Sequence, residues 1–304
     1  QRIVPTTIEF VDIAGLVKGA SKGEGLGNKF LANIREVDAI VHVIRCFEDE
    51  NILREEGEIN PVSDKEIIDT ELQLKDLESV EKKMQRYEKI AKNDPKAKRV
   101  YDVLVQCKEH LYQGKNIRAL KLEGEDFEAV ADLFLLTQKP VLYVANIDEA
   151  SIHTGNKYSE ALVKVAKEEG AQVIVMNNTI EAQISEMENA EDKEMFLGEY
   201  GLKEPGLNRL IRAAYELLNL ITYFTAGVQE VRAWTIHRGW KAPQAASVIH
   251  TDFEKGFIKA ETIAYNDYVT FKSEAACREN GKLRIEGKEY IVQDGDVLHF
   301  RFNV

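Results

Sequence analysis

The chain has 304 residues, of which 44% are hydrophobic and 30% are charged, and its formal net charge is −12. This composition is typical of a folded globular protein of one to three domains, and no stretch approaches the roughly 18 uninterrupted apolar residues of a membrane span. The three cysteines form no CxxC pair and the six histidines form no metal-binding cluster. The cysteine count therefore argues against a disulfide framework and favours a cytoplasmic protein with reduced thiols.

The negative charge disfavours a nucleic-acid partner for most of the chain, but the charge is uneven. Residues 218–304 contain 11 Lys/Arg and 11 Asp/Glu, so the residues before them carry the whole −12. A contact with RNA is therefore expected to use local patches of this C-terminal segment.

Apolar runs predict strands of a parallel sheet that is covered on both faces. The runs lie at residues 7–14, 38–47, 140–147 and 171–178. An amphipathic helix is predicted between the last two runs, at 158–170, and Gly170 ends it. Strand, helix and strand with short links are typical of a doubly wound α/β fold.

Between residues 64 and 116, apolar side chains recur at helical spacing on both sides of the sequence Asn-Asp-Pro at 93–95. These positions are Leu77, Val80, Met84, Tyr87 and Ala91, followed by Val100, Leu104, Cys107 and Leu111. Because proline breaks a helix, the pattern predicts two helices in an antiparallel, coiled-coil-like hairpin. The hairpin interrupts a βαβ rhythm, which indicates an inserted helical domain whose many Lys and Glu residues form a solvated face.

The C-terminal third predicts a helix at 204–220 with Pro205 in its first turn. Short strands with one helix between them follow. The strands are expected at 230–236, 257–263 and 289–302, and the helix at 243–250. This alternation predicts a small α+β roll such as a β-grasp.

Asp12 and Gly15 end the first predicted strand, in the sequence Val-Asp-Ile-Ala-Gly. An Asp-x-x-Gly element at this place in P-loop NTPases puts the carboxylate near Mg²⁺, usually through water, and the glycine amide near the γ-phosphate. A plain strand-ending turn is the alternative. The glycine-rich residues 16–27 fit neither GxxxxGK[ST] nor GxGxxG, so they are interpreted as a switch loop rather than a phosphate cradle. Leu16 stands where Ras-like proteins hold a water-orienting glutamine, and leucine cannot orient water.

A second polar segment, Asn146-Ile147-Asp148-Glu149, ends the strand predicted at 140–147. GTP-binding proteins commonly carry Asn-Lys-x-Asp there, and the aspartate accepts guanine N1–H and N2–H. Lysine is absent here, and the acid is the longer Glu149. Adenine lacks both donors, so the departure favours adenine over guanine. A strand followed by an acidic turn is the alternative.

Four stretches together closely resemble the Obg-like ATPases of the YchF family. They are residues 12–36, 146–149, 224–236 and 242–261. The resemblance runs from Thr6 to Val304. It implies a G domain, a helical coiled-coil insertion, a C-terminal TGS domain of β-grasp fold, hydrolysis of ATP in preference to GTP, and association with the ribosome.

Carried over by position, Asp12 and Gly15 are similar to the third G element of the family. Asn146, Ile147 and Glu149 are similar to an altered fourth element. The resemblance further implies that the fifth element lies at Asn177 and Asn178, and it places Arg54 where many relatives have a histidine.

The resemblance implies four segments. They are the first part of the G domain at 1–63, the helical insertion at 64–138, the second part of the G domain at 139–217 and the TGS domain at 218–304. The family's Walker A loop and first switch lie upstream of the Asp-x-x-Gly element, and only eleven residues precede Asp12. We therefore expect ATP hydrolysis with Mg²⁺ from the full-length protein and none from the chain as written.

Two functions from different classes remain open. The first is an Mg²⁺-dependent ATPase whose loop at 16–27 responds to the γ-phosphate, with a GTPase as a further alternative. The second is a ribosome- or RNA-binding module that uses the nucleotide only as a switch ligand, with Arg232, Lys255 and Lys259 and the helical hairpin as candidate contacts. The expected partners are ATP or GTP and the ribosome or its RNA, with no membrane and a monomeric chain.

Overall fold

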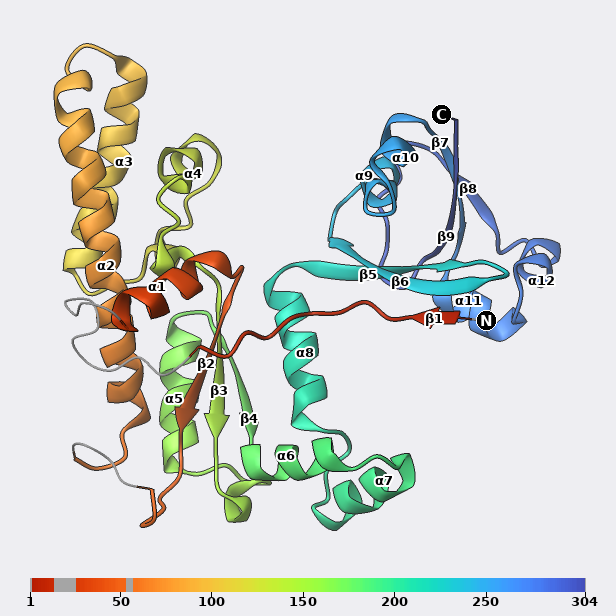
Figure 1. The fold of residues 1–304 in the computed structure, drawn as a ribbon, viewed down its shortest axis with the longest axis horizontal. Helices are drawn as coiled ribbons and strands as arrows, with labels where there is room; N and C mark the ends of the chain where they lie inside the picture. Colours follow the sequence, from red (N-terminus) through yellow and green to blue (C-terminus); the bar gives the residue numbers. More distant parts are fainter. Residues whose placement is uncertain (1, 14–25, 53–56, 304) are drawn as a thin grey trace. The chain divides into compact units, whose positions relative to one another are not determined.

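The computed structural model describes residues 2–13, 26–52 and 57–303 (Figure 1). Contacts divide the chain into two compact units, residues 11–214 and residues 1–10 together with 215–304. Among the described residues, no helix is long and apolar enough to cross a membrane.

The unit of residues 11–214 is built on a sheet of three parallel strands in the order β2-β3-β4. The strands are β2 (Ile40–Arg45), β3 (Val141–Asn146) and β4 (Gln172–Met176). The central strand β3 is buried except at its last residue, Asn146, as expected for a parallel sheet packed on both faces. Three of the four predicted parallel strands are therefore confirmed.

Helix α5 (Lys157–Glu168) connects β3 to β4 and starts at a capping box between Asn156 and Ser159. Each of the two side chains accepts a hydrogen bond from the other residue's amide, which satisfies donors that a helix start leaves unpaired. Leu162 of α5 packs with the side chains of β3 in one core. Gly170 adopts a φ of +70° just after the helix, so the predicted stop is confirmed.

This unit has further helices among its described residues. They are α1 (Leu26–Glu36), α6 (Asn178–Glu186), α7 (Ala190–Glu199) and α8 (Gly206–Leu217), the last of which continues into the second unit. Glu181 of α6 caps the start of α8, because its carboxylate accepts from the Gly206 amide at 2.6 Å and the Leu207 amide at 3.0 Å. Helix α8 begins directly after Pro205 and ends at Leu217, three residues before the predicted end.

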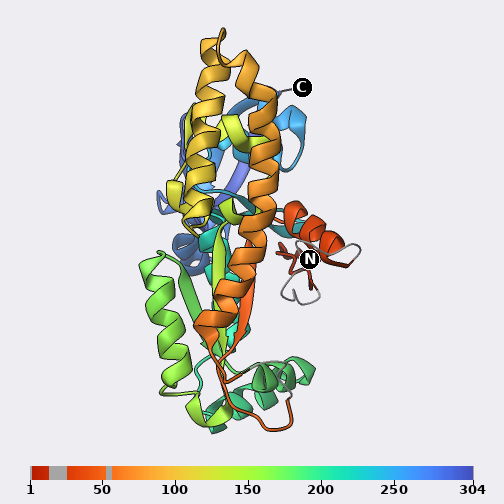
Figure 2. The ribbon, with the colours of Figure 1, turned by 90° about the vertical axis from the view of Figure 1, so that its left-hand side faces the viewer.

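Two long helices, α2 (Pro61–Ile90) and α3 (Pro95–Tyr112), form a hairpin between β2 and β3 in the sequence (Figure 2). The chain breaks where the sequence predicts, because Asp94 caps α3 by accepting from the Lys96 amide at 2.9 Å and Pro95 occupies the first turn. The buried seam contains Val80, Val103, Leu104, Cys107 and Leu111. The predicted helical hairpin is confirmed.

The chain returns to β3 through three short helices that are anchored on α2. They are η1 (Ile117–Leu120), α4 (Gly124–Ala131) and η2 (Leu136–Gln138). The fully buried Asp76 of α2 accepts hydrogen bonds from the Leu136 amide at 2.8 Å, the Thr137 amide at 2.7 Å and the Thr137 hydroxyl at 2.6 Å. Because these donors are buried, water cannot satisfy them and the Asp76 carboxylate does so instead. These three hydrogen bonds hold η2 against α2 just before the chain enters β3.

Buried charges tie the base of the hairpin to the sheet. Lys65 Nζ of α2 lies 2.6 Å from Asp69 Oδ2 and also pairs with Glu169, which follows α5. The Tyr143 hydroxyl of β3 donates to Glu169 at 3.1 Å. His42 of β2 lies 5.9 Å from the Tyr143 ring, between ring centroids, and its burial lowers its pKa to about 4. Because a buried charge without its partner costs several kcal/mol, this network holds the hairpin base in one place.

The second unit is a six-stranded mixed sheet in the order β1-β6-β5-β9-β7-β8, with short helices beside it. Its strands are β1 (Arg2–Val4), β5 (Leu220–Ala226), β6 (Glu230–His237), β7 (Phe257–Ile263), β8 (Arg284–Glu286) and β9 (Val297–Phe302). Its helices are α9 (Ala242–Ser247), α10 (Thr251–Lys255), α11 (Tyr265–Phe271) and α12 (Glu274–Glu279). The core packs Tyr223 and Ile236 against alanines of α9, with Trp234 beside them. The predicted α+β character is confirmed.

The strand predicted at 7–14 is wrong for residues 7–13, which have no regular structure. Residues 2–4 instead pair with β6, and the Thr6 hydroxyl lies 2.7 Å from that of Thr235. A strand needs a neighbour for its amides and carbonyls, and among the described residues no strand of the β2-β3-β4 sheet pairs with this segment.

The sequence pattern does not predict strand β5, and it places Leu220, the first residue of β5, in the preceding helix. Asn219 at a φ of +54° separates the helix from the strand. The strand predicted at 289–302 is regular only from Val297, since Gly295 at a φ of +83° makes a turn just before it.

Candidate functional site

The carboxyl ends of β2, β3 and β4 lie in register at one edge of the parallel sheet. Arg45 pairs with Asn146, and Asn146 pairs with Met176. The ladder continues into the loops, where the Cys46 amide donates to the Asn146 carbonyl at 2.8 Å and the Ile147 amide to the Met176 carbonyl at 3.0 Å. This edge is where open α/β sheets bind their ligands.

Asn146 and Asn178 meet at this edge, although they come from different strand ends. The Asn146 Oδ1 atom accepts a hydrogen bond from the Asn178 amide at 3.0 Å. Asn178 is exposed and Asn146 is partly buried. The structure thus brings together the two segments that the sequence assigned to base contacts.

Asn177 differs from its neighbour because its side chain is 7% exposed and engaged at both ends. Its Nδ2 donates to the Ile147 carbonyl at 2.7 Å, and its Oδ1 accepts from the Ile180 amide at 2.9 Å as the N-cap of α6. Both polar atoms of this buried side chain are thus held by other groups of the protein. The geometry therefore gives Asn177 the role of a clamp between the two loops.

The remaining residues of the Asn-Ile-Asp-Glu segment split into two structural and one exposed position. Ile147 is 1% exposed and belongs to the core around β3. Asp148 caps the short helix η3 (Glu149–Ser151), accepting from the Ser151 amide at 2.8 Å. Glu149 is exposed. Partial burial raises the pKa of the Tyr200 hydroxyl, and the neighbouring Glu149 carboxylate raises it further, so α7 brings an aromatic side chain to this acid.

Arg45 organises the loop that follows β2, although no sequence motif marks it as a site residue. Its guanidinium donates to the carbonyls of Phe47 at 3.0 Å, Asp49 at 3.1 Å and Ile52 at 3.2 Å. A hollow of about 820 Å³, including space open to solvent, lies between this loop and Tyr158 of α5. An arginine at the last position of a parallel strand was the available signal, since five donors can hold several carbonyls.

The predicted switch and metal positions are described only in part. Asp12 is exposed and precedes Ile13, which packs against the cluster between α1 and α2. Gly15, Leu16 and Arg54 lie outside the described residues. The exposed Asp12 carboxylate fits Mg²⁺ in donor type, because this ion takes oxygen ligands and commonly binds through one carboxylate, waters and phosphates.

Residues 2–88 match a family described as 50S ribosome-binding GTPase, and residues 220–303 match the YchF-GTPase_C family, described as a protein of unknown function. The ribosome-binding ATPase YchF of Haemophilus ducreyi is 55% identical over 305 residues, which cover 100% of this chain and 84% of the relative. The proteins of the same name from Escherichia coli O157:H7 and Bacillus subtilis are 54% and 52% identical, with the same coverage.

The structure is similar to that of the YchF GTPase of Schizosaccharomyces pombe. The TM-score is 0.87 at 38% sequence identity, and the match covers 99% of this chain and 82% of that one. That likeness supports the parallel sheet of a G-like domain, the helical insertion and the TGS-like C-terminal unit together. The family expected from the sequence motifs is confirmed, and the chain belongs to the YchF family.

Proposed function

We propose that the protein is a ribosome-binding ATPase that holds its nucleotide base at the joined carboxyl ends of β3 and β4. The observation that carries the proposal is the hydrogen bond from the Asn178 amide to Asn146 Oδ1. It joins the two base-contacting segments of a G-like site, and the Asn177 clamp keeps them joined. The names of the bacterial relatives support ATP as the substrate and the ribosome as the partner.

Glu149 supports adenine over guanine. The bacterial relatives are named ATPases and the fission-yeast relative a GTPase, so the choice of nucleotide falls to the residues of the site. Glu149 is exposed at the start of η3, one methylene longer than the aspartate that reads guanine. The buried Ile147 supplies no polar contact, so base contacts are assigned to Asn146, Asn178 and Glu149.

In this proposal Asp12 binds Mg²⁺ through water, and the Gly15 amide faces the γ-phosphate. When bound, Mg²⁺ supplies positive charge to the transferring phosphoryl group. Because Leu16 cannot orient water, the water-activating role falls to another group.

The proposed domains follow the family. The G-domain segments are assigned to 1–63 and 139–217, the helical insertion to 64–138 and a β-grasp TGS domain to 218–304. A cytoplasmic location follows from a ribosomal partner.

Equilibrium binding of ATP and GTP to the full-length protein tests the adenine assignment. We expect tighter binding of ATP, and Glu149→Asp is expected to shift the ratio of the two affinities toward GTP by about tenfold, the worth of one hydrogen bond. Glu188→Asp changes an exposed acid of the loop after α6 in the same way and serves as the control. A wild-type preference for GTP contradicts the proposal.

The second candidate is a ribosome- or RNA-binding module in which the nucleotide acts only as a switch ligand. The observation that favours it is a cluster of exposed cations on the C-terminal unit. The two candidates differ in whether hydrolysis is needed to leave the ribosome. If a non-hydrolysable ATP analogue supports one round of binding but blocks release, the ATPase is favoured. If release is unchanged, the switch module is favoured.

A further inference from the structure

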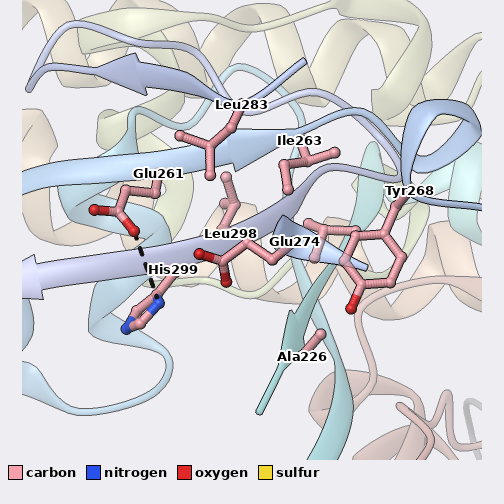
Figure 3. Close-up of a pocket in the computed structure, with 9 residues that line it drawn as sticks. Ala226, Glu261, Ile263, Tyr268, Glu274, Leu283, Leu298 and His299 are labelled. Atoms are coloured by element: carbon pink, nitrogen blue, oxygen red, sulfur yellow. Dashed lines mark ion pairs between the residues drawn. The ribbon is translucent and has the colours of Figure 1, made fainter. Parts of the chain in front are cut away.

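The face of β7 and β9 that points away from the core carries charged side chains. Figure 3 shows Glu261 of β7 and His299 of β9 there, with Glu274 of α12 near them. Lys259 of β7 and Arg301 of β9 are partners across the two strands, and the residues beside them, Ala260 and Phe300, belong to the core. Side chains alternate between faces along a strand, so both cations lie on the opposite face. Glu261 and His299 share that face, and α12 adds Arg278.

Glu261 lies at the centre of four nitrogen-bearing side chains. These five residues are called the Glu261 cluster: Lys259, Glu261, Arg278, His299 and Arg301. Arg301 Nη2 lies 3.2 Å from its carboxylate, and Arg301 Nε donates to it at 3.4 Å. Lys259 Nζ and Arg278 Nη2 each lie at 3.8 Å, and His299 Nδ1 at 4.0 Å. Two carboxylate oxygens therefore draw four nitrogen-bearing side chains of β7, α12 and β9 to one point.

Exposure divides the cluster into a base and an outer layer. The Glu261 side chain is 9% exposed, whereas those of Lys259, Arg278, His299 and Arg301 are 41% to 60% exposed. A guanidinium has five N–H donors and an ammonium three, and most of them remain free to bond outward. The pKa of Glu261 is lowered, first by its hydrogen bond with Arg301, so the carboxylate is charged when the outer layer meets a ligand.

We propose that the Glu261 cluster is the surface of the C-terminal unit that binds phosphates of ribosomal RNA. The inference rests on the proposed ribosome binding and names the contact. Arginine forks match phosphate oxygens in pairs, and Glu261 holds two arginines and a lysine close enough for one phosphate or two adjacent ones. Lys259, Arg278 and Arg301 against Glu261 and Glu274 give a local charge of +1 on a segment that is neutral as a whole.

The three cations that the sequence suggested do not all belong to this surface. Lys259 is part of the cluster, whereas Arg232 lies over the ring of Trp234 with 4.0 Å from its guanidinium carbon to the ring centroid. Trp234 packs on the core, so Arg232 belongs to the other face of the sheet. Sequence spacing could not show this, because the cations that gather around Glu261 come from three separate elements.

The same place could also be considered for a metal ion, since ligand atoms of Glu261, Glu274 and His299 lie within 4.8 Å of one another. The charges argue against that use. Three cations already lie within 4 Å of Glu261, and Arg278 also pairs with Glu274 at 3.0 Å. A divalent ion would have to displace them and accept their repulsion. An anion would instead be attracted by these three cations.

The test is sedimentation of the full-length protein with purified ribosomes and, separately, with protein-free ribosomal RNA, over a series of salt concentrations. Lys259→Gln and Arg301→Gln are each expected to weaken binding about fivefold at low salt and to reduce the salt slope by about one. Lys288→Gln removes an equal charge from an exposed loop outside the cluster and is expected to change nothing. Glu261→Gln keeps one oxygen that can accept from Arg301, raises the local charge to +2 and is expected to tighten binding.

A binding surface predicts weaker binding for Lys259→Gln and Arg301→Gln but tighter binding for Glu261→Gln. A purely structural role predicts that all three substitutions weaken binding. Equal weakening by Glu261→Gln, or wild-type behaviour of Lys259→Gln and Arg301→Gln, overturns the proposal. So does binding to ribosomes without binding to protein-free RNA, which would indicate a protein partner. If the wild-type protein does not bind ribosomes at all, the proposed function fails instead.

Discussion

Replacement of Asn177 by alanine tests whether this residue clamps the site or contacts the base. Alanine removes the N-cap of α6, which is worth about 1 kcal/mol, and the bond to the Ile147 carbonyl, worth about 1 kcal/mol more. Because the side chain is 7% exposed, water does not easily replace either bond, and the Ile147 carbonyl is left unsatisfied. We therefore expect the free energy of unfolding to fall by about 2 to 3 kcal/mol.

Urea unfolding followed by circular dichroism measures this loss, with Asn178→Ala as the control. Asn178 is exposed and uses its backbone amide toward Asn146, so its alanine variant is expected to lose less than about 0.5 kcal/mol. Asn177→Ser keeps an acceptor for the Ile180 amide and is expected to fall between the two. If Asn177→Ala is as stable as Asn178→Ala and only loses nucleotide affinity, the clamp assignment is refuted.

Two further predictions concern the sheet and the hairpin. The pKa of His42 is lowered from 6.5 to about 4 by burial, with the Asp69 charge opposing and those of Lys65 and Arg118 assisting. Stability is therefore full above pH 6.5 and falls by up to about 3 kcal/mol as the pH drops toward 4, a loss that His42→Gln should remove from pH-dependent melting curves. Leu104→Ala, at a fully buried position of the hairpin seam, is expected to cost about 3 kcal/mol in urea unfolding, whereas the exposed Leu74→Ala should cost less than about 1. Equal losses of stability in the two variants would contradict the assignment of Leu104 to the buried seam.

The periodic parts of the sequence predicted their own structure. Strands β2 to β4 are short apolar runs bounded by turn residues, and the seam of α2 and α3 with its Asn-Asp-Pro break specifies a hairpin from local pattern alone. The errors lie where a partner decides the structure. Residues 7–13 have the composition of a strand but pair with none among the described residues, and Leu220 belongs to β5 because it pairs with His237 of β6.

The sequence predicts where the candidate site lies but not which role each of its residues has. Asn146, Asn177 and Asn178 stand at strand ends, which sequence patterns locate. That Asn177 turns inward while Asn178 faces solvent depends on where α6 begins and on the distant Ile147 carbonyl. The roles of Arg45 and Glu261 could not be inferred either, because each depends on several groups that only the folded chain brings together.

The buried contacts of Lys65 have a geometric consequence for the helical hairpin. Lys65 pairs with Asp69 inside α2 and with Glu169 outside it, and α2 continues from Asp69 to Ile90 for about 30 Å. A tilt of α2 by about 5° at these contacts would move its far end by about 3 Å. The buried contacts at one end of α2 therefore set where the far end of the hairpin lies.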